Sequence, residues 1–160
     1  MSQIECFLKI DGIDGESQDV QHKGEIAIQS WSWGESQSIP SSSGSGAGAG
    51  KVNLQPFQFT MLTSKASPKL FLAGASGQRL KTAALTCRQS GQKGIEFLKI
   101  TLSDVLVSSF GTSSDASVPV DQLSLSYAKI VYEFTPQKAD GSLDVTVKSG
   151  WDVKANKASD

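Results

Sequence analysis

Strict alternation of apolar and polar residues is the feature that most constrains how this chain can fold. It is clearest in residues 4–10 and 55–61, where every second position is apolar. The apolar positions are Ile4, Cys6, Leu8 and Ile10 in the first segment and Phe57, Phe59 and Met61 in the second. A period of two is that of a β-strand with one buried face. The chain is therefore expected to be mainly β.

Further strands are expected at residues 25–37, 79–88, 94–110, 120–134 and 143–153. Segments rich in Gly, Ser, Pro and Asp separate them, a spacing typical of an antiparallel sandwich or barrel. Within residues 25–37 the apolar phase shifts by one residue between Ile28 and Trp31, which predicts a bulge or a change of buried face. The length of 160 residues fits one domain, residues 1–160. The polar tail after Lys154 is expected to fray.

One short helix is expected where the period changes after residue 64. Ser67 is a suitable N-cap and Pro68 a suitable first helical residue, while Gly74 or Gly77 would end the helix. The expected fold is thus an antiparallel β-barrel or sandwich with one flanking α-helix.

Residues 38–50 are a run of Ser, Gly and Ala that predicts a long exposed loop between two strands. A phosphate-binding loop is rejected, because Ser45 replaces its first Gly and Val52 replaces its hydroxyl residue. A loop of this length within one domain is usually functional or disordered. We expect a mechanical role, in which Gly44, Gly46, Gly48, Gly50 and Lys51 lie against a neighbouring surface.

One face of the strand at residues 120–134 is small, polar and uncharged, with Gln122, Ser124 and Ser126 in the same phase. If Trp31 and Trp33 face the core, Ser30 and Ser32 face away from it. Together these residues predict a smooth hydrophilic wall, whereas ordinary exposed strands usually carry more Lys and Glu. Plain solvent exposure of these polar residues is an equally good interpretation.

The sequence gives little support for an enzymatic function. His22 is the only histidine and lies in a polar stretch without a nucleophile elbow, so it is expected to be structural. No cofactor motif or metal-ligand cluster is evident, and the acidic residues 11–19 do not follow the spacing of a calcium-binding loop. Cys6 and Cys87 both lie in apolar alternating runs, so two buried reduced thiols are expected, with one disulfide as the alternative.

Charge and hydropathy exclude two classes of partner. The net charge is −1, with 15 basic and 16 acidic residues and no basic stripe, so no nucleic-acid partner is expected. Apolar runs do not approach ~20 residues, so membrane insertion is not expected either. The first five residues do not resemble a cleaved signal peptide.

A series of motifs runs through the whole chain. It comprises Asp11-Gly12-Ile13-Asp14-Gly15-Glu16-Ser17, His22, residues 25–34 ending in Trp31-Ser32-Trp33-Gly34, the Gly-rich residues 44–52, Ser67-Pro68, residues 100–109, Pro136-Gln137-Lys138-Ala139-Asp140-Gly141 and Gly150-Trp151-Asp152. In this order the chain resembles the Hcp family, the secreted tube subunits of bacterial type VI secretion systems. The resemblance implies a β-barrel of two packed sheets with one helix, and a homohexameric ring that stacks into a tube.

The resemblance also implies partner proteins, contact residues and a cellular location. The tube would lie inside a contractile sheath on a baseplate, carry a VgrG spike protein at its tip and hold small effector proteins in its channel. Ser32 and part of the 122–128 face would line that channel, and residues 38–50 would reach a neighbouring subunit or ring. The chain would assemble in the cytoplasm and be secreted without a cleaved signal peptide. A monomeric, ligand-binding β-barrel is the alternative.

Overall fold

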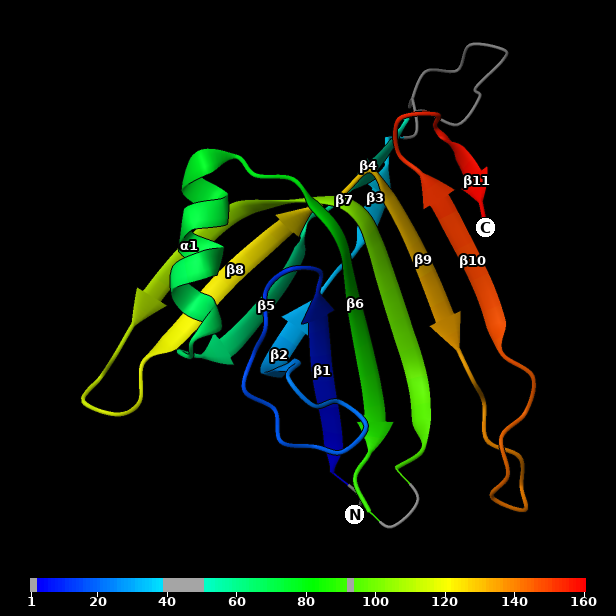
Figure 1. Ribbon diagram of the computed structural model, residues 1–160. Coiled ribbons are helices and arrows are strands. Elements are labelled where there is room, and N and C mark those ends of the chain that lie inside the picture. Colours follow the sequence, from blue (N-terminus) through cyan, green and yellow to red (C-terminus); the bar gives the residue numbers. More distant parts are fainter. Residues whose placement is uncertain (1–2, 39–50, 92–93) are drawn as a thin grey trace.

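The chain folds mainly into antiparallel strands (Figure 1). A computed structural model describes residues 3–38, 51–91 and 94–160. The elements are β1 (Ile4–Ile10), β2 (Ile26–Ser32), β3 (Glu35–Gln37), β4 (Val52–Leu54), β5 (Phe57–Leu62), α1 (Ala66–Ser76), β6 (Leu80–Gln89), β7 (Glu96–Ser113), β8 (Val120–Ser126), β9 (Lys129–Phe134), β10 (Val147–Asp152) and β11 (Lys157–Ser159). The expected mainly-β barrel with one helix is confirmed.

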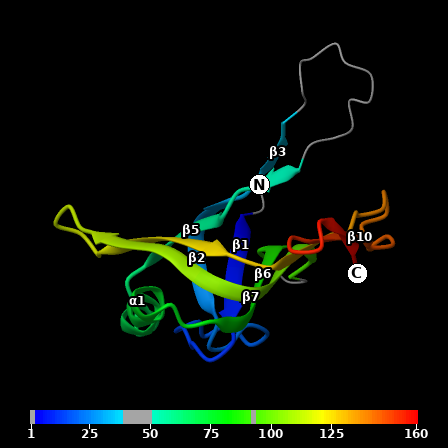
Figure 2. The same cartoon turned by 90° about the horizontal axis from the view of Figure 1, so that it is seen from above.

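One continuous sheet closes on itself to form the barrel. Its order is β11-β10-β9-β7-β6-β1-β2-β5-β8, and the additional pairing of β7 with β8 closes a six-stranded barrel. Strands β9, β10 and β11 continue outward from β7, and we call these three strands the extension (Figures 1 and 2). The long strand β7 belongs to both parts, because Leu98 to Ser103 pair with β9 and Leu106 to Ser113 pair with β8.

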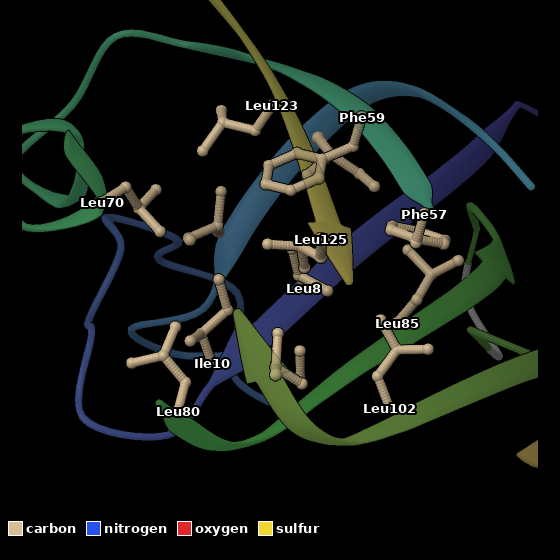
Figure 3. Packing of buried hydrophobic residues seen from close by; sticks show 14 of the residues in the cluster. Leu8, Ile10, Phe57, Phe59, Leu70, Leu80, Leu85, Leu102, Leu123 and Leu125 are labelled. Carbon is tan, nitrogen blue, oxygen red and sulfur yellow. The ribbon is translucent and has the colours of Figure 1, made fainter. Parts of the chain in front are cut away.

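Alternation along each barrel strand sends one set of side chains inward. Phe57, Leu85, Leu102 and Leu125 come from four different strands and are almost completely buried in one cluster (Figure 3). Leu70 of α1 joins the same cluster, so the helix packs its apolar face against the barrel. Burying side chains of this size contributes about 1.5–3 kcal/mol each relative to exposure. The barrel interior is therefore a packed core.

The helix begins before the predicted cap. Its N-cap is Lys65, so the prediction that Ser67 caps the helix is wrong, whereas the predicted end at Gly77 is confirmed by a φ of 68°. The Ser67 hydroxyl instead donates to the carboxylate of Asp121 on β8 and accepts from the Ser64 backbone N–H at 3.0 Å. Thr63 also donates to Asp121, at 2.7 Å. This fully buried carboxylate fixes the start of the helix against β8.

Two predicted strands are each divided in two. The segment at residues 120–134 is divided into β8 and β9, because Ala128 bonds to the Ser103 carbonyl (3.0 Å) and the chain exchanges β5 for β10 as a neighbour. The segment at residues 25–37 is divided into β2 and β3, since β3 leaves the barrel to pair with β4 (Figure 2). The tail was expected to fray, but β11 pairs with β10.

Candidate functional site

Two rows of uncharged residues cross four neighbouring strands on the outer side of the barrel. Each residue lies opposite the next in the register of β2, β5, β8 and β7. The first row is Ser30, Thr60, Gln122 and Gly111, and the second is Ser32, Gln58, Ser124 and Ser109. We call these eight residues the polar wall. Ionisable side chains are absent from both rows.

Core packing determines which way the polar wall faces. Between its two rows lies an apolar row that packs against the core: Trp31, Phe59, Leu123 and Phe110. Trp31 stacks on Phe57 with 5.9 Å between ring centroids. Because neighbouring residues of a strand point to opposite faces, burying this row turns both polar rows outward.

A β-bulge sets the phase of the wall on β2. The register with β5 shifts between Ile28 and Ser30, as the sequence phase predicted. The extra residue lets Ile28 and Trp31 both face the core although they are three positions apart. Without the bulge, Ser30 and Ser32 would not share a face with Thr60 and the rest of the wall.

The wall lines a concavity. All eight of its residues, together with the four residues of the apolar row, surround an open depression of about 520 Å³. Several wall hydroxyls are paired within the wall: Ser30 with Thr60 at 2.6 Å and Ser109 with Ser124 at 2.6 Å. Ser124 is only 8% exposed, and Ser108 also approaches its hydroxyl, at 2.7 Å. The surface is concave, polar and internally hydrogen-bonded.

The structure brings together four of the five residues expected on this surface. Ser30, Ser32, Gln122 and Ser124 all line the depression. Ser126 continues the same face of β8 but pairs with Leu106 and is not among the lining residues.

Sequence reasoning missed the wall residues of β5 and β7. Gln58 and Thr60 alternate with buried Phe57, Phe59 and Met61, so the same period of two predicts their direction. Their place beside Ser30 and Ser32 depends on strand pairing, which the local pattern does not contain.

The expected contact loop is described only at its base. Gly44, Gly46, Gly48 and Gly50 lie outside the described residues, and Lys51 is exposed just before β4. Strands β3 and β4 form a two-stranded sheet that stands away from the barrel (Figure 2).

This hairpin is fixed to the barrel at its base. Trp33 donates to the Tyr127 hydroxyl at 2.5 Å, and Tyr127 donates to the Gln55 carbonyl at 2.8 Å. Burial raises the pKa of Tyr127 above its ordinary value, so the hydroxyl stays protonated and can donate.

The burial and contacts of His22 indicate that this residue supports the fold. It is 6% exposed, and its ring stacks on Phe7 with 4.5 Å between centroids. Its Nδ1 lies 3.0 Å from Glu25 and its Nε2 lies 2.7 Å from Glu96. Both ring nitrogens are thus engaged by carboxylates, which leaves neither for activating a nucleophile.

Arg88 lies on the same aromatic ring as His22. Its guanidinium carbon is 4.9 Å from the centroid of Phe7, and it binds Asp19 and, at 3.3 Å, Glu5. Arg88 holds the pKa of Asp19 below its ordinary value, chiefly through their hydrogen bond. The cluster ties the loop before β2 to β1 and β6.

The described residues contain no group of three or more His, Cys, Asp or Glu side chains placed to hold a metal ion. None of the helices described there is long and apolar enough to cross a membrane.

Comparisons with known proteins agree with one another. The profile of the family described as "Type VI secretion system effector, Hcp" matches residues 7–134. The chain is 46% identical over 157 residues to "Protein hcp1" of Pseudomonas aeruginosa, covering 96% of this chain and 97% of that protein.

Solved structures have the same fold. A structure titled "Structure of a type six secretion system protein" superimposes with a TM-score of 0.91 at 27% identity, covering 98% of this chain and 100% of the other. Hcp1 from Salmonella typhimurium has a TM-score of 0.79 at 32% identity, with 99% and 100% covered. The chain therefore belongs to the Hcp family of type VI secretion proteins.

Proposed function

We propose that this Hcp protein is a structural subunit of the inner tube of a type VI secretion system. Six copies form a ring, the rings stack, and the tube is expelled with the VgrG spike by a contractile sheath assembled on a baseplate. Subunits assemble in the cytoplasm and leave it without a cleaved signal peptide. Family membership supports this assignment. The observation that supports a channel-lining surface is the polar wall.

The wall suits a channel that holds cargo transiently. Ser30, Ser32, Gln122, Ser124 and, beyond the depression, Ser126 would face the lumen. Strong charge complementarity selects some partners and repels others. The wall has no charged group to hold a cargo tightly, and four of its hydroxyls are paired with each other. Small effector proteins of varied charge could therefore be carried and released.

The extension supports self-assembly. Phe134 at the end of β9 is 44% exposed, and Val147 at the start of β10 is 65% exposed. Val145, in the segment between these strands, is 77% exposed. Exposed apolar side chains that gather on one part of a monomer indicate a protein interface. Strand β11 also forms an edge of the sheet in the single chain, and such an edge is usually paired or protected.

The loop at residues 38–50 is proposed to contact a neighbouring subunit or ring. Gly44, Gly46, Gly48, Gly50 and Lys51 would form this contact. The fixed hairpin base supports the proposal, because β3 and β4 themselves stand away from the barrel.

The alternative is a monomeric ligand-binding barrel, which would need a cavity inside the barrel. Phe57 and Leu125 are both 0% exposed and lie in the barrel interior with Leu85 and Leu102 (Figure 3). The packed interior therefore favours the tube subunit.

Light scattering coupled to size-exclusion chromatography tests the proposal over a range of concentrations. We expect a particle of six chains of 16.9 kDa each, and negative-stain images should show rings. Val147→Glu should shift the protein toward monomers. Val20→Glu is the matched control, since Val20 is 94% exposed in a loop outside the extension. A wild-type protein that stays monomeric at every concentration would overturn the proposal.

A further inference from the structure

Cys6 and Cys87 lie directly opposite each other on neighbouring strands, although 80 residues separate them in the sequence. Strands β1 and β6 pair without a register shift from Ile4 with Gln89 to Ile10 with Ala83. Both thiols are free, with Cys87 buried and Cys6 half-buried. They belong to a row that points toward the core, where Cys87 joins the buried cluster and Cys6 packs against it.

The hydrogen bonds at the two ends of this ladder show which type of antiparallel pair Cys6 and Cys87 form. Ser90 N–H donates to Gln3 O at 2.7 Å, and Asp11 N–H donates to Thr82 O at 3.0 Å. Opposed residues alternate between hydrogen-bonded and non-hydrogen-bonded pairs along an antiparallel ladder. Both ends place the hydrogen-bonded pairs at odd-numbered residues of β1, so Cys6 and Cys87 form a non-hydrogen-bonded pair.

Opposed residues at such a position have close side chains. Their Cα atoms are typically ~4.5 Å apart, which lies within the ~4.4–6.8 Å observed for disulfides. The two thiols contact each other, and their hydrogen bond lowers the pKa of Cys6 while it raises that of Cys87. Cys6 is also the more accessible thiol, so it is the better placed of the two to meet an oxidant.

We propose that Cys6 and Cys87 form a reversible disulfide within one chain when the protein meets a small disulfide oxidant such as oxidised glutathione. The Cys6 thiolate attacks one sulfur of the oxidant, forms a mixed disulfide and releases the first small thiolate. Cys87 then attacks Cys6 Sγ and releases the second. The two cysteine sulfurs lose two electrons to the oxidant, and their two protons end on the two released thiols.

The bridge would join β1 to β6 and close a long loop of the chain, which stabilises a fold mainly by restricting its unfolded state. The chemistry holds whether or not the chain forms rings. Its biological setting rests on the proposed function, since a subunit that leaves a reducing cytoplasm meets more oxidising conditions afterwards.

The test is to incubate the native protein with oxidised glutathione, alkylate the remaining thiols and measure the intact mass. We expect both thiols to resist alkylation, a mass lower by two hydrogen atoms, no disulfide-linked dimer, and full reversal by dithiothreitol. Two thiols that remain alkylatable, or a lasting glutathione adduct on wild-type Cys6, would overturn the proposal. These readouts come from single chains, so they stay separate from a failure to form rings.

Two variants identify the role of each cysteine. Cys87→Ser should stop at the mixed disulfide on Cys6, because the resolving thiol is gone. Cys6→Ser should leave Cys87 unmodified, because the buried thiol lacks access to the oxidant. Equal glutathione adducts in both variants would contradict the assignment of Cys6 as the attacking thiol. Circular dichroism checks that each variant is folded, and the wild-type measurement stands without them.

Discussion

Ser30 on β2 and Thr60 on β5 lie opposite each other, with their hydroxyl oxygens 2.6 Å apart. This pair and the pair of Ser109 with Ser124 lie within the polar wall, which carries no ionisable side chain and so presents no charge to a passing molecule. A single charge should therefore change its character more than a single uncharged substitution.

Ser32→Arg places a charge at the β2 end of this surface. Because Ser32 is exposed and lies off the core, we expect rings to form as in the wild type and the free energy of unfolding to change by less than about 0.5 kcal/mol. Retention of a co-purifying effector should change at least several-fold, with Ser32→Gln giving a smaller effect. Quantitative mass spectrometry of the purified complex measures this.

Gln78→Arg is the matched control for Ser32→Arg, because it adds the same charge at an exposed residue just after α1, outside the wall. It should leave cargo retention unchanged. If both arginine variants retain cargo like the wild type, the polar wall does not line the channel.

Acid should weaken the fold through Asp19. Arg88 lowers the pKa of Asp19 in the folded state, so the contribution of this ion pair is fully present above the ordinary value of about 3.8 and is lost as the pH falls through the lower folded value. Asp19→Asn should be less stable than the wild type at pH 7, and its stability should fall less steeply below pH 4. Urea unfolding across this range measures both effects.

Asp14→Asn is the control for Asp19→Asn, since Asp14 is an exposed carboxyl of the same loop. It should reproduce the steep wild-type loss of stability in acid. Parallel curves for the wild type and Asp19→Asn would contradict the role of the Arg88 ion pair.

Replacing His22 tests whether this histidine supports the fold or a reaction. His22→Ala removes the stacking on Phe7 and the contacts with Glu25 and Glu96, and we expect a loss of about 2–4 kcal/mol in the free energy of unfolding. Lys23→Ala, at the exposed next position, should be nearly neutral. Unchanged stability together with loss of a hydrolytic activity would revive the enzyme interpretation.

Gly150 allows β11 to approach β10. A Cβ at Gly150 would lie 2.8 Å from the Ser159 carbonyl oxygen, so Gly150→Ala should displace β11 and cost about 1–3 kcal/mol. Gly111→Ala is the control, because its Cβ would meet only Gln122 O at 4.0 Å. Hydrogen exchange of the β11 amides should rise in the first variant alone. Unchanged protection of these amides in Gly150→Ala would show that the pairing of β11 with β10 does not require a glycine at this position.

Local pattern was sufficient where one face of a strand is buried and the other is exposed. The bounds of β1, the bulge after Ile28 and the helix end at Gly77 all follow from spacing and residue type. The polar phase of Gln122 and Ser124 was also readable, because each alternates with a buried leucine.

The local sequence pattern failed where a contact with a residue far away in the sequence determines the local structure. Ser67 precedes Pro68 as a capping serine would, but Asp121 on β8 binds its hydroxyl. The break between β8 and β9 is set by the bond from Ala128 to Ser103, and the sequence pattern continues through it. The opposition of Cys6 and Cys87 likewise depends on the pairing of strands far apart in the chain.

Strand β7 gives the molecule a mechanical continuity. Its 18 residues pair first with β9 of the extension and then with β8 of the barrel, and between the two pairings Asp104 has a φ of 54°. A pull on the extension along this strand would load its rows of hydrogen bonds to β6 and β8 in shear, so many bonds would have to fail together. If the proposed ring is held together through the extension, a force on one subunit would pass along β7 directly into the barrel of that subunit.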